Sequence, residues 1–258
     1  MKYKLLDLFC GGGGCSKGYV DAGFEVVGID IEEKNYPYEF IKADVMEILE
    51  DENFIKNFDA IHASPPCQCY SRLKYLSGDV ERWESTHVDL VEPVRNKLIY
   101  YKEKYKIPYV IEYVVGAPLI NPIKLCGTQF NNMLTQRPRL FESSISLREP
   151  NVKPSNIGTS KLGTISETGA VSICGNRKLQ GLNEEQTRLY YCIALGGDCS
   201  WMTLKELTQC IPPQYTEFIG KQIIEYIDSQ HNNKANETVL NIEGFDMDAF
   251  IELVMQHI

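Results

Sequence analysis

The stretch Ser64-Pro65-Pro66-Cys67-Gln68 places a cysteine directly after two prolines, at the end of the apolar segment 59–63. Each proline fixes its own φ angle and restricts the residue before it, so the turn is stiff and the thiol leaves it in a defined direction. A structural cysteine needs no such mounting, whereas a nucleophile must be held about 3 Å from the atom that it attacks. The stretch therefore predicts that Cys67 is a nucleophile.

A second group of residues has the pattern of a ligand-binding turn. The glycines 11–14 follow an apolar segment, Tyr3 to Leu8, and precede a predicted helix, Ser16 to Ala22, that ends at Gly23. Such a turn lets a ligand approach the backbone, and the helix N-terminus favours polar or anionic groups. The pattern is not a strict G-x-G-x-x-G, so by itself it does not establish a nucleotide site.

Two acidic residues and an aromatic residue strengthen the nucleotide interpretation. Asp30 ends the predicted strand 24–29, where a carboxylate can accept both hydroxyls of a ribose. Asp44 ends the segment 40–44 and could hold an adenine amino group. The alternative for each acid is a helix cap or a solvated loop residue. Phe9 is otherwise a core residue, but beside the glycine turn it could stack on a purine.

Strands that alternate with helices must position these residues. Strands are predicted at 3–8, 24–29, 40–44, 60–63 and 109–114, with a helix from Val88 to Lys104 before the last of them. This alternation predicts a doubly wound, mostly parallel α/β sheet, in which the site lies beyond the carboxyl ends of the strands. The glycine turn, Asp30, Asp44, Cys67 and Glu112 all fall at those ends, so we expect them to form one site.

Composition limits the classes of protein that remain. The 258 residues are 43% hydrophobic, which suffices for one sizeable core. A net charge of −9 argues against a general nucleic-acid coating protein, but it leaves room for a local basic cleft. The nine cysteines, with no signal peptide and no membrane-spanning run, predict a reduced cytoplasmic protein without a membrane partner. Cys67-x-Cys69 is too short a spacing to bind zinc alone, and the sequence has no second His or Cys cluster to complete such a site, so no metal is expected.

The chain changes character after Phe141. Residues 149–170 are rich in Pro, Ser, Asn, Thr and Gly, which predicts the loops or short strands of a small lobe. Further helices are predicted at 183–195 and 215–227, followed by a polar linker at 229–237 and an amphipathic helix at 244–258.

Four motifs occur in the order and spacing of the DNA (cytosine-5)-methyltransferases, and the chain resembles this family over roughly residues 3 to 228. Two further segments, 125–142 and 202–220, look like those of the short, phage-type members. The resemblance implies a Rossmann-like, S-adenosylmethionine-dependent methyltransferase fold with a small target-recognition lobe. The motifs are Asp7 to Gly13, Pro66-Cys67-Gln68, Ile111-Glu112-Tyr113-Val114 and Arg137-Pro138-Arg139.

The resemblance also implies the catalytic roles. Cys67, as a thiolate, adds to C6 of a cytosine that is flipped out of double-stranded DNA. Glu112 binds the N3 and N4 edge of the base, and Arg137 and Arg139 lie near its O2 atom. The two arginines alternate along a predicted strand, so both side chains are expected on one face.

S-adenosyl-L-methionine is the cofactor that the resemblance implies. It donates the methyl group that C5 of the cytosine receives. The residues expected to contact it are Phe9, Gly11, Gly12, Gly14, Asp30, Ile31, Asp44, Val45, Pro66, Thr216 and Glu217.

The resemblance also implies a division of the chain into three regions. The catalytic, cofactor-binding domain comprises residues 1–142 and 201–228, the target-recognition lobe residues 143–200, and a linker with the C-terminal helix residues 229–258. The segment 68–86 resembles the loop that closes over the flipped base, and its basic and aromatic residues suit DNA contact. We expect a monomer in the cytoplasm of a bacterial or phage-infected cell.

Two residues depart from the family pattern. Tyr113 stands where the family usually has asparagine, which helps to fix the proline–cysteine loop, and Thr135 stands where it usually has glutamine, with Gln136 displaced by one. Because members of the wider family act on tRNA, one alternative is a tRNA cytosine C5-methyltransferase. Tyr113 leaves two others, a variant that uses a modified S-adenosylmethionine and a catalytically weak or inactive DNA-binding homologue. Retention of Cys67, Glu112 and Arg139 argues against the inactive homologue.

Overall fold

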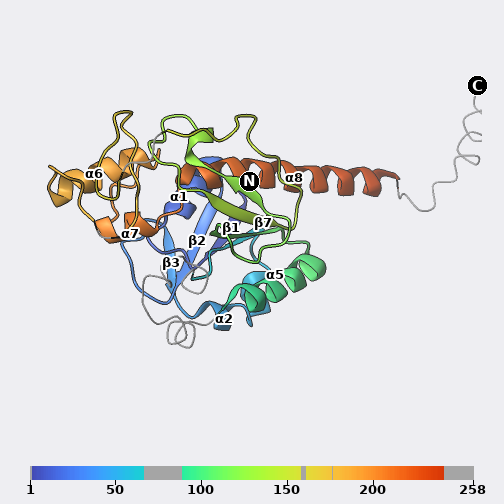
Figure 1. The fold of residues 1–258 in the computed structure, drawn as a ribbon. Helices are drawn as coiled ribbons and strands as arrows, with labels where there is room; N and C mark the ends of the chain where they lie inside the picture. Colours follow the sequence, from blue (N-terminus) through green and yellow to red (C-terminus); the bar gives the residue numbers. More distant parts are fainter. Residues whose placement is uncertain (1, 67–88, 158–160, 176, 241–258) are drawn as a thin grey trace, which may run out of the picture. The chain divides into compact units, whose positions relative to one another are not determined.

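The computed structural model describes residues 2–66, 89–157, 161–175 and 177–240 (Figure 1). The chain divides into two compact units, Met1–Ile223 and Ile224–Ile258. The first unit contains all the elements discussed below, and the last helix, α8 (Pro213–Leu240), begins in it. Cys67 and the predicted DNA-contacting loop 68–86 lie outside the described residues.

A seven-stranded sheet forms the centre of the first unit (Figure 1). The strand order is β3-β2-β1-β4-β5-β7-β6; the first five strands are parallel, and β7 runs antiparallel to both of its neighbours. The predicted doubly wound class is confirmed, and each predicted strand is present to within two residues. The strands are β1 (Lys4–Leu8), β2 (Glu25–Asp30), β3 (Glu39–Lys42), β4 (Ala60–Ala63), β5 (Tyr109–Val114), β6 (Ile123–Leu125) and β7 (Arg139–Ser143).

The connections of this sheet create a crevice at its carboxyl edge. The chain moves from β1 outward to β2 and β3, then crosses to β4 on the other side of β1. The loops that follow β1 and β4 therefore run in opposite directions, which is where doubly wound sheets bind ligands. The glycine turn follows β1, and Ser64-Pro65-Pro66 follows β4, so the fold brings both predicted motifs to this crevice.

Helices cover both faces of the sheet. Leu49, Ile55 and Leu98 pack with strand residues such as Leu6 and Ile61 in the main core. The central strands are almost continuously buried, because each of their faces lies against a helix layer. The helices that supply this core are α2 (Val45–Ile48), α3 (Glu52–Ile55) and α5 (Val91–Tyr105).

The helix α1 (Gly14–Ala22) begins at the glycine turn and packs closely on the start of α8. Gly13, its N-cap, has a φ of 84°. At Gly18, an added Cβ would lie 2.0 Å from the carbonyl oxygen of Pro213 and 2.1 Å from Oγ1 of Thr216. The two helices therefore approach each other to a distance that only glycine permits at this position.

A buried ion pair fixes strand β7 against α5. Nε and Nη2 of Arg95 donate to the two carboxylate oxygens of Glu142, each over 2.8 Å. Two parallel hydrogen bonds of this kind hold both side chains in one orientation. Because β7 begins at Arg139, this pair also fixes the strand that carries a predicted catalytic residue.

The second half of the chain forms a smaller core. Its members include Val171, Tyr191 and Cys210. The helix predicted at 183–195 is confirmed as α6 (Glu184–Ala194), and α7 (Leu204–Gln209) follows it. Residues 149–157 and 161–170 contain no helix or regular strand, as predicted. The target-recognition role of residues 143–200 stays a prediction.

The polar linker predicted at 229–237 is wrong. Helix α8 continues through this segment to Leu240. The segment has neither Gly nor Pro, and polar composition alone does not end a helix. The helix predicted at 244–258 lies outside the described residues. In the part of the chain that the structure describes, no helix is long and apolar enough to cross a bilayer.

We expect Gly18→Ala to destabilise the fold by about 3 kcal/mol, because the new methyl group overlaps backbone atoms of α8 that cannot rotate away. Urea unfolding measures the loss. Asp21→Ala, on the exposed side of the same helix, is the control and should cost about 0.5 kcal/mol or less. Equal stability of the two variants would contradict the close packing of α1 on α8.

Candidate active site

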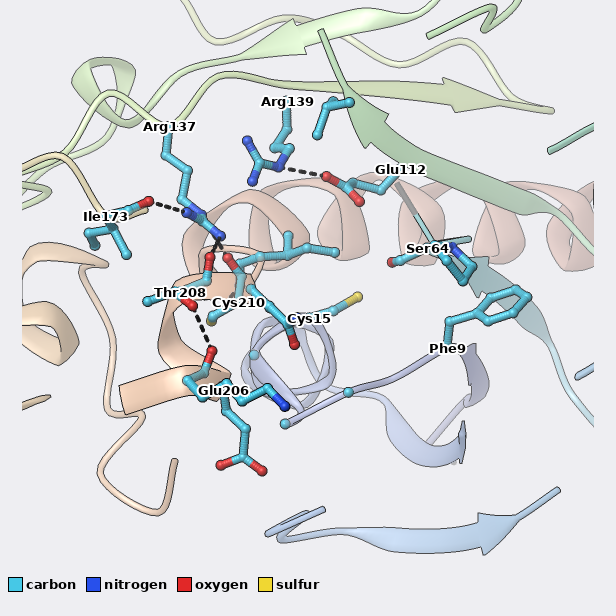
Figure 2. Close-up of a pocket in the computed structure, with 18 of the residues that line it drawn as sticks. Phe9, Cys15, Ser64, Glu112, Arg137, Arg139, Ile173, Glu206, Thr208 and Cys210 are labelled. Carbon is cyan, nitrogen blue, oxygen red and sulfur yellow. Dashed lines mark hydrogen bonds and ion pairs between the residues drawn. The ribbon is translucent and has the colours of Figure 1, made fainter. Parts of the chain in front are cut away.

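A cavity of about 1150 Å³ opens at the carboxyl edge of the sheet (Figure 2). Ligand sites commonly measure about 300–1,000 Å³, so this cavity has room for two ligands side by side. Residues predicted for the cofactor and residues predicted for catalysis line the same space. They are Phe9, Gly11, Gly12, Gly14, Asp30, Ile31, Asp44, Val45, Pro66, Glu112, Arg137 and Arg139.

Three predicted site residues are not placed in this lining. Thr216 is fully buried between α1 and α8, where its hydroxyl donates to the carbonyl of Cys15 over 2.8 Å. Glu217 accepts a 2.6 Å hydrogen bond from Lys221 one turn further along α8. Cys67 lies outside the described residues, and Pro66, which precedes it, lines the cavity.

The glycine turn and Asp30 form one end of the cavity. Phe9 and Gly11 both have left-handed backbone conformations, with φ values of 61° and 51°. The amide of Gly11 donates to Oδ2 of Asp30 over 3.0 Å, and the amide of Glu32 donates to Oδ1 over 3.0 Å. Each carboxylate oxygen can accept a further hydrogen bond, so Asp30 both ties the turn to β2 and remains available to a ligand.

Asp44 has two roles in the structure. Its Oδ1 atom accepts a 2.7 Å hydrogen bond from the amide of Met46, so Asp44 is the N-cap of α2. This is the alternative considered from the sequence. The residue also lines the cavity, next to the buried side chain of Val45.

The donor set at this end suits a nucleoside. Asp30 and Asp44 offer carboxylate oxygens to hydroxyl and amino groups, and Phe9, Ile31 and Val45 supply apolar contact for a flat base. The N-terminus of α1 opens on the same space and favours a polar group. The residues present therefore fit the cofactor that the sequence predicts.

Glu112 and Arg139 meet at the other end of the cavity. Nε of Arg139 lies 3.0 Å from Oε1 of Glu112, whose side chain is 9% exposed. The N–H is not aligned with this oxygen, and among the described residues Oε1 accepts no hydrogen bond. Burial raises the pKa of Glu112, although the charges of Arg139 and Arg137 offset part of the effect. The raised pKa favours the protonated form of Glu112, and its Oε1 atom can accept a hydrogen bond from a ligand.

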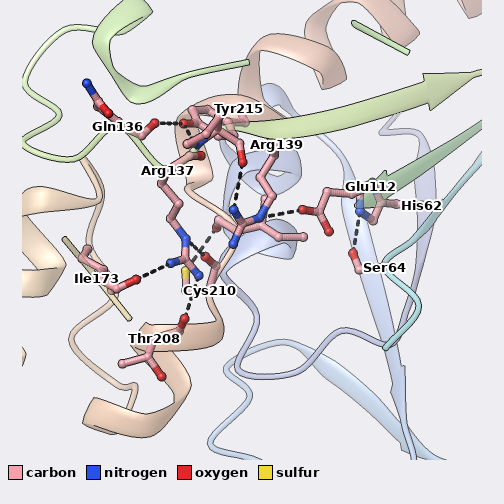
Figure 3. A network of polar contacts seen from close by, with 12 residues as sticks. His62, Ser64, Glu112, Gln136, Arg137, Arg139, Ile173, Thr208, Cys210 and Tyr215 are labelled. Carbon is pink, nitrogen blue, oxygen red and sulfur yellow. Dashed lines mark hydrogen bonds and ion pairs between the residues drawn. The ribbon is translucent and has the colours of Figure 1, made fainter. Parts of the chain in front are cut away.

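Arg137 has a different environment from the one predicted (Figure 3). Strand β7 begins at Arg139, so Arg137 lies outside it and has a φ of 33°. Its guanidinium donates to the carbonyls of Cys210, Ile173 and Thr208 over 2.7, 3.0 and 2.8 Å. The prediction that both arginines alternate along one strand is therefore wrong. Strand β7 begins only after Pro138, and the Arg137 side chain binds three backbone carbonyls instead.

Burial lowers the pKa of Arg137 to about 10, and repulsion from Arg139 adds to the shift. The group still carries its charge at neutral pH, and three carbonyl dipoles compensate for the lost water. Among the described residues, Arg139 by contrast donates to the carbonyl of Pro138 and forms the ion pair with Glu112. Of the two predicted arginines, Arg139 is the one whose charge faces the acid.

The turn before Cys67 is held by side chains on two strands. Nε2 of His62 lies 2.9 Å from Oγ of Ser64 (Figure 3). Nδ1 of His62 lies 2.9 Å from the hydroxyl of Tyr19. Burial lowers the pKa of His62 to about 3, so the imidazole is neutral at pH 7. Two residues further on, the carbonyl of Pro66 accepts a 2.5 Å hydrogen bond from the hydroxyl of Tyr113 on β5.

A buried carboxyl group lies under the glycine turn. Asp7 is fully buried and accepts a hydrogen bond from the hydroxyl of Ser16, which lies 2.6 Å from the hydroxyl of Tyr36. Burial raises the pKa of Asp7 from 3.8 to about 7, although hydrogen bonds from Ser16 and Cys15 lower it in part. Ionisation of Asp7 near neutral pH therefore opposes folding.

The sequence did not identify the wall that residues 170–175 and 205–211 contribute to the cavity. Trp201 also supports the site, because its indole N–H donates to the carbonyl of Gly12 over 2.8 Å. Both segments are far from the glycine turn in sequence. Although 205–211 lies in the segment 202–220 that resembles the family, no residue of either segment is predicted in the site, and the tertiary fold brings them to it.

Asp7→Asn should reveal the buried ionisation. A raised folded-state pKa stabilises the protein fully below pH 3.8, and this contribution is lost as the pH rises through about 7. The free energy of unfolding of Asp7→Asn, relative to that of the wild type, should therefore rise by about 4 kcal/mol from pH 4 to pH 8. Urea titrations across this range measure the difference, and a pH-independent difference would contradict the shifted pKa.

Arg137→Lys should lower the free energy of unfolding by about 3 kcal/mol, because one ammonium group cannot reproduce three hydrogen bonds in a guanidinium plane. Arg139→Lys is the matched control and should cost about 1 kcal/mol or less, since its charge is kept and no comparable set of bonds is lost. Thermal and urea unfolding compare the two. Similar losses would show that Arg137 does not hold these segments together.

Comparison of the sequence with protein families agrees with the motifs. Residues 3–98 match the family model of the C-5 cytosine-specific DNA methylases. The Type II methyltransferase M.FnuDI of Fusobacterium nucleatum is 39% identical over 83 residues, which is 29% of this chain and 24% of that protein. The Type II methyltransferase M.HgiGI of Herpetosiphon aurantiacus is 35% identical over 78 residues, 26% of this chain and 62% of that protein. The chain thus spans less than two thirds of these curated relatives.

Solved structures extend the likeness of the fold to most of the chain. A protein described as a DNA modification methyltransferase from an E. coli prophage aligns with a TM-score of 0.57 and 13% identity, covering 88% of this chain and 100% of the other. The Dnmt2 methyltransferase of S. pombe aligns with a TM-score of 0.56 and 14% identity, covering 88% and 99%. Residues 3–98 thus match the C-5 cytosine-specific DNA methylases in sequence, and the fold of most of the chain resembles that of these solved methyltransferases.

Proposed function

We propose that the protein transfers a methyl group from S-adenosylmethionine to C5 of cytosine in double-stranded DNA. The observation that carries this proposal is the shared cavity. The glycine turn with Asp30, the pair Glu112–Arg139 and Pro66 all line it. A methyl donor and a pyrimidine bound at its two ends would lie next to each other, beside the residue that precedes Cys67.

The proposed first step is addition of the Cys67 thiolate to C6 of the pyrimidine. A bond forms between Sγ and C6, and the electron pair of the C5–C6 double bond moves into the ring towards N3 and O2. Burial raises the pKa of Glu112, which favours its protonated form, and a protonated Glu112 can donate a hydrogen bond to N3. Arg139, 3.0 Å from Glu112, would stabilise negative charge at O2.

At the other end of the cavity, Asp30 would hold the ribose hydroxyls of S-adenosylmethionine, and Asp44 the adenine amino group. Phe9, Ile31 and Val45 would contact the adenine ring. When bound, this cofactor supplies the electrophilic methyl group for C5. A base then removes the C5 proton, and elimination of the thiolate restores the aromatic ring and frees Cys67.

Arg137 has no direct step in this scheme. Its three guanidinium nitrogens are engaged by backbone carbonyls, so it would shape the cavity rather than contact the base. Thr216 and Glu217 likewise lack the contact with the cavity that a cofactor residue needs. The monomeric state, the cytoplasmic location and the absence of a metal, which the sequence predicts, stay predictions.

A trapping experiment tests the reaction. The protein is incubated with S-adenosylmethionine labelled in its methyl group and with duplex DNA in which 5-fluorocytosine replaces cytosine. Fluorine at C5 blocks the elimination, so we expect a covalent protein–DNA adduct that carries the label. Cys67→Ala should abolish the adduct, whereas Cys126→Ala, a buried thiol outside the cavity, should retain it.

Parallel reactions separate the alternatives. Transfer to tRNA and not to DNA would favour the RNA methyltransferase, and transfer only from a donor with an enlarged group would favour the modified cofactor. No transfer to either nucleic acid would leave the inactive homologue and would overturn the proposed function.

A further inference from the structure

The segment Ser64-Pro65-Pro66 is fixed at both ends by hydrogen bonds. The amide of Ser64 donates to the carbonyl of Leu8 over 3.1 Å, and its hydroxyl lies 2.9 Å from Nε2 of His62. At the other end, the hydroxyl of Tyr113 donates to the carbonyl of Pro66 over 2.5 Å. The first end is thus tied to β1 and β4, and the second end to β5.

The Tyr113 side chain is well suited to hold a fixed position. It follows Glu112 on β5, and 1% of it is exposed. A buried phenol ring has few conformations, so its hydroxyl stays in one place. Pro66, in contrast, is exposed on the wall of the cavity and cannot be held by close packing.

The contact acts on a peptide unit of particular importance. The carbonyl oxygen of Pro66 belongs to the peptide bond that joins Pro66 to Cys67. A peptide unit is planar, so a hydrogen bond that fixes this oxygen also fixes the plane and the direction in which the chain enters Cys67. Proline fixes its own φ but leaves its ψ free, and ψ of Pro66 is the angle that this hydrogen bond sets.

We infer that Tyr113 is a positioning residue for the nucleophile: its hydroxyl fixes the Pro66–Cys67 peptide and so aims the thiol at the pyrimidine. The inference rests on the proposed function. It assigns to Tyr113 the support of the turn before Cys67, although the residue is not the usual asparagine. Tyrosine at this position is then a substitute donor and not a defect.

The test compares Tyr113→Phe with the wild type. The variant loses one hydroxyl and keeps the buried ring. We expect the single-turnover rate of methyl transfer to fall about ten- to a hundredfold, as a displacement of the order of 1 Å would cause. The dissociation constant for S-adenosylmethionine and the KM for DNA should stay within about twofold, because neither ligand contacts the hydroxyl. This separation of kcat from KM distinguishes positioning from a general loss of structure.

Tyr101→Phe is the matched control. Tyr101 is equally buried, and its hydroxyl donates to a backbone carbonyl, that of Leu49, over 2.8 Å on the α5 side of the sheet. Both variants should lose a similar amount of thermal stability, but only Tyr113→Phe should lose rate. Both are assayed well below their melting temperatures.

Amide hydrogen exchange gives a second reading that needs no activity. The amide of Ser64, which donates to the carbonyl of Leu8, is measured in a peptide covering residues 60–66 and should exchange faster in Tyr113→Phe than in the wild type or in Tyr101→Phe. Unchanged exchange shows that Tyr113 does not hold the segment, even if the wild type transfers no methyl group and the proposed function fails. Faster exchange with a wild-type rate of transfer equally overturns the positioning role.

Discussion

The cavity depends on one buried charge. The guanidinium of Arg137 can remain charged inside the protein because each of its three nitrogens donates to a backbone carbonyl, those of Cys210, Ile173 and Thr208. These carbonyls come from two segments that are remote in sequence from Arg137. These hydrogen bonds hold the segments of the smaller core next to Arg137, where they form one wall of the cavity. Arg139, two residues on, is thereby free to face Glu112.

Burial also sets the charges around this wall. It keeps His62 neutral, so the histidine can hold Ser64 without placing a second positive charge beside the arginines. It raises the pKa of Glu112, which favours the protonated carboxyl group at the end of the cavity that we propose for the base. The same effect at Asp7 lowers stability near neutral pH. The site is therefore maintained at a cost to folding, as expected where electrostatics are arranged for chemistry.

The sequence predicted the sheet and most of the site because the relevant signals are local. An apolar strand, a glycine turn and an acid at the next strand end lie within 30 residues, and the parallel fold brings such ends together. The role of Arg137 could not be predicted in this way. Its three partners are backbone carbonyls, which every residue has, so no pattern of side chains marks them. The extension of α8 was missed for a related reason: polarity says little about where a helix ends.

Tyr113 shows the limit of reasoning from motifs alone. A motif records which residue is usual at a position, and a bulky phenol in place of a small amide indicates lost function. What the neighbouring turn requires, however, is a hydrogen-bond donor at the Pro66 carbonyl, and a hydroxyl at the end of a rigid, buried ring meets that requirement. The length of the Tyr113 side chain matches the position of the Pro66 carbonyl, because the hydroxyl reaches it over 2.5 Å. The effect of tyrosine at this position therefore cannot be judged apart from the turn that its hydroxyl contacts.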